Sequence, residues 1–192
     1  YAFGGQGRSR ILVKTIVKFL YKLSLAKACA VIFQNSDNKT FFIELGLVDP
    51  SKAFLVNGSG VNLEYFSYHP YRANGNRISF LMIARLLKDK GILEFLSAAR
   101  SLKSEYNNVD FILLGHEDKS ENAVSIAEIT KLDKAGVISY CGFVNDVRKF
   151  LVSSTVYVLP SYHEGLPRSV LEAMAIGRPI ITTDVPGCRE TV

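Results

Sequence analysis

The sequence has no tryptophan, two methionines and three cysteines among its 192 residues. It has no stretch of 18 uncharged apolar residues, so the sequence excludes a transmembrane helix. No leader peptide is visible, although the first residues read as an internal stretch of a chain. Cys29, Cys141 and Cys188 are odd in number and far apart. They fit reduced thiols, as in a cytoplasmic protein, rather than a disulfide framework.

Several site patterns are also missing. No Asp-x-Asp pair occurs, which argues against Mg²⁺ or Mn²⁺ holding a diphosphate, and His69 and His116 lack partners at metal-ligand spacing. No G-x-G-x-x-G follows a predicted strand, which disfavours a nicotinamide oxidoreductase. Basic and aromatic residues do not interleave as in nucleic-acid grooves. We therefore expect no metal, no cofactor and no nucleic-acid partner.

The chain is 48% hydrophobic and 21% charged, as expected of a folded protein. Its formal charge of +5 comes from one element, because six of the 23 basic residues and none of the 18 acidic ones lie in residues 1–30. Residues 8–28 predict an amphipathic helix with Arg10, Lys14, Lys18 and Lys22 on one face. Such a helix can lie on an anionic membrane surface. We favour a helix that covers a sheet, because a strand follows at once.

Strand and helix patterns alternate along the chain. Apolar runs predict strands, and helical periodicity predicts the segments between them. This alternation specifies an α/β fold with a parallel sheet covered on both faces. The predicted strands are 30–34, 53–56, 78–84, 109–115, 137–140, 156–159 and 179–182, and the predicted helices after the first are 39–45, 92–104, 120–134, 147–152 and one that begins near Pro167.

The most informative stretch follows the strand 156–159. A short loop holds Glu164 and Gly165, and a helix with Glu172 about one turn in comes next. Open α/β sheets bind phosphate-bearing ligands where strand ends face helix N-termini. Two carboxylates eight residues apart suit different hydroxyl groups of one long anionic ligand. Spacing alone does not separate this site from an ordinary turn with two solvated glutamates.

The full sequence of this stretch indicates a protein family more specifically than the spacing of the two glutamates does. From Glu164 to Glu190 the sequence EGLPRSVLEAMAIGRPIITTDVPGCRE closely resembles, without a gap, the E-x7-E region of retaining GT-B glycosyltransferases of the GT4 family. The segments ARLLKDKGI and NGSGVN resemble other parts of that family. The resemblance implies the GT-B architecture, in which two Rossmann-like domains bind a nucleotide-sugar donor and an acceptor.

The resemblance also implies a domain division. Residues 1–66 correspond to the C-terminal part of an N-terminal acceptor domain, residues 67–77 to an interdomain linker, and residues 78–192 to a C-terminal nucleotide-sugar-binding domain that is truncated at its end. Both ends look cut, so we expect a fragment that binds donor weakly and transfers nothing alone.

The resemblance assigns the charged site residues. Arg85 and Lys90 grip the donor diphosphate and, with Glu164, form the catalytic set. Arginine binds phosphate as a planar fork and lysine as a point charge. Their charge takes the place of a metal in stabilising the leaving group. Glu164 binds the donor sugar, and Glu172 binds the ribose hydroxyls.

Backbone groups complete the implied donor site. Gly165 and Leu166 supply amides to the sugar or diphosphate, and glycine at 165 allows close approach. Val144, in a loop beside the nucleobase, acts through its backbone. The side chains of Phe143 and Val144 are expected to pack against the protein.

The implied activity is transfer of a sugar with retained anomeric configuration. The donor is a UDP-hexose or UDP-N-acetylhexosamine, and the acceptor is a glycan or lipid-linked glycan. The less favoured interpretation of helix 8–28, a peripheral contact with the cytoplasmic face of the membrane, would bring the chain to a lipid-linked acceptor. A GT-B-fold nucleotide-sugar epimerase is an alternative, but needs further acid–base residues. A non-catalytic nucleotide-sugar-binding module is another, against which the intact charged residues argue.

Overall fold

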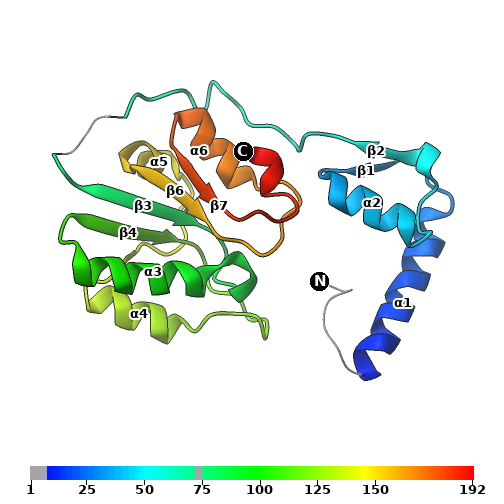
Figure 1. Ribbon diagram of the computed structural model, residues 1–192, viewed down its shortest axis with the longest axis horizontal. Coiled ribbons are helices and arrows are strands. Elements are labelled where there is room, and N and C mark those ends of the chain that lie inside the picture. Colours follow the sequence, from blue (N-terminus) through cyan, green and yellow to red (C-terminus); the bar gives the residue numbers. More distant parts are fainter. Residues whose placement is uncertain (1–7, 72–74) are drawn as a thin grey trace. The chain divides into compact units, whose positions relative to one another are not determined.

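A computed structural model of the chain describes residues 8–71 and 75–192 (Figure 1). These residues form two compact units that divide between Gly58 and Ser59. The glycine-rich lead-in and part of the expected linker lie outside the described residues. No helix in the described part of the chain has both the length and the apolarity needed to span a bilayer.

The first unit contains two helices and a two-stranded parallel sheet. Val31 pairs with Ala53 in this sheet, and a small apolar cluster around Phe33 and Leu47 holds the unit together. Asn35 caps the second helix, because its side chain accepts a hydrogen bond from the Asn38 amide at 2.8 Å. The elements are α1 (Arg8–Leu25), β1 (Val31–Phe33), α2 (Ser36–Glu44), a 3₁₀ turn (Pro50–Lys52) and β2 (Ala53–Leu55).

The favoured interpretation of the basic helix is wrong in this structure. We expected the apolar face of α1 to cover a sheet, but its large apolar side chains are exposed, with Ile11 at 63% and Phe19 at 60%. Within its unit, α1 contacts α2 through the Tyr21 ring, which meets Phe42 edge-on at 5.2 Å, and Leu25 packs on the small core. Among the described residues, the helix therefore exposes most of its apolar face beside its lysines.

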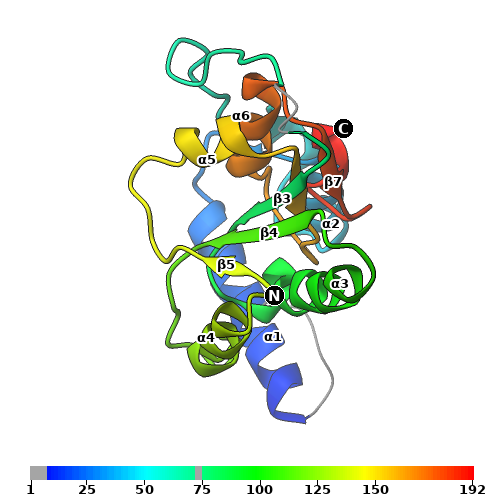
Figure 2. The same ribbon diagram turned by 90° about the vertical axis from the view of Figure 1, so that its left-hand side faces the viewer.

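The second unit is a five-stranded parallel sheet in the order β5-β4-β3-β6-β7. Helices α3 and α4 cover one face, and α5 and α6 cover the other (Figure 2). This confirms the predicted α/β fold. The elements are β3 (Ile78–Ile83), α3 (Ile92–Glu105), β4 (Val109–Leu114), α4 (Ile126–Lys134), β5 (Ser139–Tyr140), α5 (Arg148–Ser153), β6 (Val156–Leu159), α6 (Arg168–Ile176) and β7 (Ile180–Thr182), with 3₁₀ turns at Lys88–Lys90 and Arg189–Thr191.

The strand order reverses between β3 and β6. The chain adds β4 and β5 on one side of β3, and then returns to add β6 and β7 on the other side. The loops after the parallel strands β3 and β6 leave the sheet in opposite directions, and open α/β sheets bind ligands at the carboxyl edge beside such a reversal. We call the place between these two loops the β3–β6 crevice. Here those loops are residues 84–91 and 160–167.

One predicted helix begins later than expected. The sequence predicts a helix over 120–134, but α4 starts at Ile126. Residues 122–124 instead pair with the loop after β3: the Lys88 amide donates to the Asn122 carbonyl at 2.9 Å, and the Val124 amide to the Leu86 carbonyl at 2.8 Å. Val124 is buried. These tertiary bonds replace the first helical turns and brace the site loop.

The expected domain boundaries stay a prediction, but segment 59–71 has clear partners in the second unit. Phe66 is buried in its core, and the His69 amide donates to the Ile176 carbonyl at 3.0 Å. Buried Arg178 donates to the carbonyls of His69 and Ser154. Phe66 and His69 thus hold this segment against the second unit.

Candidate functional site

Two loops meet at the crevice between β3 and β6. The Tyr162 amide and the Ser161 hydroxyl both donate to the Asp89 carbonyl, at 2.9 and 3.1 Å. Gly91 has a φ of +76°, and a Cβ atom there would lie 2.1 Å from the Pro160 carbonyl oxygen. Only glycine permits both this backbone conformation and this approach. The contact places the loop of Lys90 directly against the loop of Glu164.

Lys90 and Glu164 form the central ion pair of this crevice. The Lys90 Nζ lies 2.7 Å from Glu164 Oε1, and their side chains are 17% and 16% exposed. A third loop supports the glutamate, because the Glu164 amide donates to the Pro186 carbonyl at 3.1 Å. The structure thus brings together the residues predicted for the diphosphate and for the sugar.

Arg85 lies at the outer side of the same loop and is half exposed. Its guanidinium is 3.4 Å from Asp118 Oδ2, in the loop after β4. Hydrogen bonds from Ser120 chiefly lower the pKa of Asp118, and Arg85 adds to this. The sequence analysis missed Asp118. The acidic run Glu117-Asp118 directly after a strand was the available signal, because such loops gather at the carboxyl edge.

Glu172 lies on α6, which begins just after Pro167 and ends at Ile176, with Gly177 as its C-cap. Its side chain is 13% exposed and pairs with Arg168 one turn earlier, at 3.1 Å. Burial raises the pKa of Glu172 above its ordinary value, while Arg168 opposes the rise. Glu164 therefore precedes the helix and Glu172 lies one turn into it, as predicted.

The remaining predicted residues lie in loops at the same edge of the sheet. Gly165 and Leu166 are half-buried between Glu164 and α6, and Val144 follows β5 and packs against the core. The expectation for Phe143 is wrong. Its side chain is 68% exposed, and its ring meets His116 edge-on at 6.0 Å. An aromatic pair therefore borders the loop of Val144.

The described residues offer no metal site. Within residues 8–71 and 75–192, no group of three or more histidine, cysteine, aspartate or glutamate side chains is placed to hold a metal ion. Three cationic side chains of these loops and of α6 have acidic partners: Arg85 pairs with Asp118, Lys90 with Glu164 and Arg168 with Glu172.

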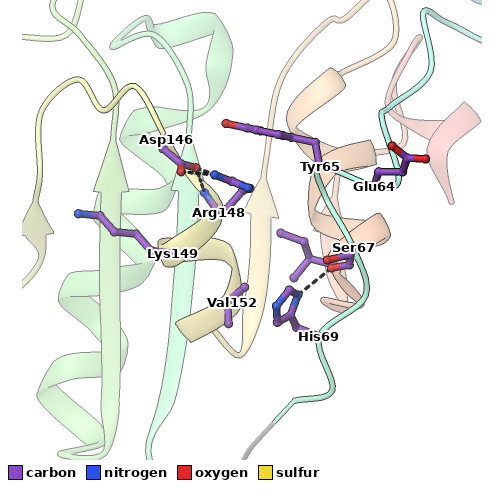
Figure 3. A pocket seen from close by; sticks show the side chains of 9 residues that line it. Glu64, Tyr65, Ser67, His69, Asp146, Arg148, Lys149 and Val152 are labelled. Carbon is purple, nitrogen blue, oxygen red and sulfur yellow. Dashed lines mark hydrogen bonds and ion pairs between the residues drawn. The ribbon is translucent and has the colours of Figure 1, made fainter.

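A separate hollow of approximately 350 Å³ lies between segment 64–69 and α5 (Figure 3). Arg148 binds Asp146 through two hydrogen bonds of 2.9 and 2.7 Å and lies 3.9 Å from the centre of the Tyr65 ring. His69 and Lys149 also line it, but among its described lining residues there is none of the seven predicted site residues. The hollow is thus distinct from the crevice.

Comparison with known proteins agrees with the resemblance. The model of the family described as glycosyl transferases group 1 matches residues 69–192. The chain is 35% identical to the N,N'-diacetylbacillosaminyl-diphospho-undecaprenol alpha-1,3-N-acetylgalactosaminyltransferase of Campylobacter jejuni, over 97% of this chain and 50% of that protein. It is 28% identical to the UDP-Gal:alpha-D-GlcNAc-diphosphoundecaprenol alpha-1,3-galactosyltransferase of Escherichia coli, over 97% and 51%. The chain spans about half the length of these relatives.

Solved structures show the same fold. A glycosyltransferase from Rickettsia africae matches with a TM-score of 0.74 at 21% identity, over 92% of this chain and 50% of that one. Anabaena HepE in complex with UDP and glucose matches with a TM-score of 0.71 at 20% identity, over 93% and 50%. These likenesses confirm the predicted GT-B type of fold.

Proposed function

Because the chain belongs to the group 1 glycosyl transferases, we propose that it forms the donor-binding part of a retaining glycosyltransferase. The observation that supports this most is the contact of Lys90 with Glu164 at the β3–β6 crevice. A cation suited to a diphosphate and a carboxylate suited to sugar hydroxyls lie there side by side. A nucleotide-diphosphate sugar has these two chemistries joined by one bond.

In the proposal, Arg85 and Lys90 bind the diphosphate. Arg85 lies two residues after the end of β3. Its half-exposed guanidinium can donate hydrogen bonds in one plane to phosphate oxygens. Lys90 lies deeper, where its charge is less screened by solvent. Together they stabilise the negative charge that develops on the leaving diphosphate, so transfer needs no metal ion.

The carboxylates orient the rest of the donor. Glu172 accepts hydrogen bonds from the ribose hydroxyls, and Glu164 from the transferred sugar. Gly165 and Leu166 donate backbone amides to the sugar or diphosphate, and the backbone of Val144 faces the base. A carboxylate that is mostly buried and still ionised is a strong acceptor for hydroxyl groups.

The proposed reaction keeps the anomeric configuration. The acceptor oxygen forms a bond to the anomeric carbon on the face from which the diphosphate departs. The bond between that carbon and the diphosphate oxygen breaks, and the leaving phosphate takes the proton of the acceptor hydroxyl. The site's task is to hold the donor and the departing charge in place.

Two similar proteins support the proposed donor class. One relative is named as a UDP-Gal transferase, and Anabaena HepE binds UDP. We therefore propose UDP-hexose or UDP-N-acetylhexosamine as donor. Both named relatives act on diphospho-undecaprenol-linked glycans, and we propose a glycan or lipid-linked acceptor in glycoconjugate synthesis.

The proposal places the protein at the cytoplasmic face of a membrane through α1. Exposed Ile16, Phe19 and Leu23 can enter the headgroup region while Lys14 and Lys18 meet anionic lipid. Co-sedimentation with vesicles containing phosphatidylglycerol tests this. The proposal is supported if the chain binds these vesicles and if Phe19→Ser and Lys18→Glu each weaken that binding. If the chain does not bind them, the apolar face of α1 packs against protein instead.

Calorimetric titration of the chain with UDP, GDP and ADP tests the proposed function. We expect UDP to bind, and Arg85→Ala and Glu172→Ala to weaken that binding. Arg100→Ala is the matched control, because Arg100 is an equally exposed arginine paired with Glu128 at 3.1 Å on the α3–α4 face. If none of the three nucleotides binds, or if Arg100→Ala weakens binding as much as Arg85→Ala, the proposed donor site is wrong.

A further inference from the structure

One buried hydroxyl group links the two elements that form the crevice. Tyr157, on β6, is completely buried. Its hydroxyl donates to the Ile83 carbonyl at 3.2 Å, and the side chain of Ser169 on α6 is its other polar neighbour. Ile83 ends β3, two residues before Arg85, and Ser169 lies in the first turn of α6, three residues before Glu172.

The position of this link follows from the sheet. The ladder between β3 and β6 pairs Leu81 with Tyr157. The tyrosine ring then extends toward the carboxyl edge and reaches the Ile83 carbonyl two residues further along β3. A hydroxyl buried this deeply needs partners, and a low dielectric constant strengthens its hydrogen bond to the Ile83 carbonyl. The Tyr157 side chain thus continues the connection between β3 and β6 where the ladder stops.

We propose that Tyr157, together with Ser169, is a positioning pair that fixes the spacing between the Arg85–Lys90 loop and the helix of Glu172, so that one nucleotide diphosphate spans both. This inference rests on the proposed function. Neither residue touches the ligand in this account: Tyr157 acts through the residue that ends β3, and Ser169 through the first turn of α6.

A ligand that spans both elements and one that touches only one of them should respond differently. UDP contacts the cations through its diphosphate and Glu172 through its ribose. Uridine contacts the Glu172 side and the loop of Val144, but not the cations. Inorganic pyrophosphate contacts the cations and the amides of loop 160–167, which the close approach of Gly91 to Pro160 holds against the cation loop without Tyr157. Fixed spacing makes the second contact of UDP effectively intramolecular. Loosening the spacing should therefore weaken the binding of UDP and leave the affinity for each half-ligand unchanged.

The test is Tyr157→Phe, which keeps the ring and removes the hydroxyl. The 192-residue chain is titrated with UDP, uridine and pyrophosphate by NMR, below the unfolding transition of every variant. We expect UDP affinity to fall about tenfold, and the two half-ligand affinities to change by less than about twofold. Ser169→Ala should show the same pattern, and Ser169→Thr should bind UDP as tightly as the unaltered chain. The double variant Tyr157→Phe/Ser169→Ala should bind UDP no more weakly than Tyr157→Phe alone.

Tyr71→Phe is the matched control. The Tyr71 hydroxyl lies 3.3 Å from Thr155 Oγ1, just before β6 begins, at the opposite edge of the sheet. Its removal should leave all three affinities unchanged. If Tyr157→Phe fails to fold, the comparison of Ser169→Ala with Ser169→Thr gives the same test.

The outcomes separate this inference from the proposed function. Unchanged UDP affinity in Tyr157→Phe and Ser169→Ala overturns the positioning pair while the donor site stands. An equal loss for UDP, uridine and pyrophosphate also overturns it, because that marks general loosening of the fold. If the unaltered chain binds UDP no better than GDP or ADP, or not at all, the proposed function fails and the inference falls with it.

Discussion

The Lys90 ammonium group and the Glu164 carboxylate lie 2.7 Å apart although 74 residues separate them in the chain. Each residue belongs to a loop that follows one of two adjacent strands, β3 and β6. The sequence predicts one for a diphosphate and the other for a sugar. Because the two groups neutralise each other, the proposed donor has to redistribute this contact when it binds.

Lys90→Met should destabilise the fold. It leaves a mostly buried carboxylate without its closest cation, and we expect a loss of about 1–3 kcal/mol in the free energy of unfolding. Lys90→Met combined with Glu164→Gln should cost less than the sum of the single changes. Urea unfolding measures both. Lys103→Met, which breaks the more exposed pair with Asp110 at 3.3 Å, should cost less, and additive effects at 90 and 164 would contradict the account.

Asp118→Asn should strengthen UDP binding. Asp118 holds the Arg85 guanidinium at 3.4 Å, and the diphosphate must compete with it. Because the arginine is half exposed and the pair is screened by solvent, the gain should be only about twofold to fivefold, and it should shrink as salt rises. Calorimetry at 50 and 300 mM NaCl measures this. Weaker binding in Asp118→Asn would mean that Asp118 orients Arg85 for the ligand instead.

The residues of the candidate site could be proposed from the sequence because they lie in one gapless stretch and one loop motif. Local sequence motifs indicate the four charged residues Glu164, Glu172, Arg85 and Lys90. The alternation of strands and helices then places these residues at one edge of a sheet. The partner residues could not be predicted this way. Asp118 and Tyr157 reach the site only through pairing of β4 and β6 with β3, and local sequence does not encode that pairing.

Glu172 should make both stability and binding depend on pH. Burial raises the pKa of its carboxyl in the folded protein. The folded state then holds its proton more tightly than the unfolded chain, so Glu172 contributes stability below its ordinary pKa of 4.5 that is lost as pH rises through the raised value. Relative to Glu172→Gln, the wild type should lose stability over that window in urea unfolding.

UDP binding should show the opposite trend, because the ionised carboxylate is the ribose acceptor in the proposal. Affinity should rise as pH increases through the raised pKa of Glu172, and Glu172→Gln should bind weakly without this rise. Arg168→Met should move the rise to higher pH, since Arg168 lowers the pKa of Glu172. A pH profile of Glu172→Gln identical to that of the wild type would contradict the role of Glu172.

Gly91→Ala should disrupt the site loop. The new Cβ would meet the Pro160 carbonyl at 2.1 Å while the backbone keeps a positive φ, so we expect a loss of about 2–4 kcal/mol together with loss of UDP binding. Gly136→Ala is the control. Its φ is +70° with no atom within 4 Å of the new Cβ, so only the backbone cost of about 1 kcal/mol applies. Equal losses would show that close approach at Gly91 is unimportant.

The errors of the sequence analysis have a common physical cause. The helix predicted over 120–134 loses its first turns because Asn122 and Val124 form backbone bonds with the loop after β3. The apolar face of α1 was expected against a sheet, yet α1 packs on its unit through Tyr21 and Leu25. Periodicity reports which residues share a face, but long-range contacts decide what that face meets.

The most direct test of the donor site is to map UDP on the isotope-labelled chain by amide chemical shifts. The account predicts that the shifts concentrate in residues 85–91, 142–145 and 164–172, with the amides of Gly165 and Leu166 among the largest. Shifts that concentrate instead around Tyr65, Asp146 and Arg148, the hollow of Figure 3, would contradict it and place the nucleotide outside the β3–β6 crevice.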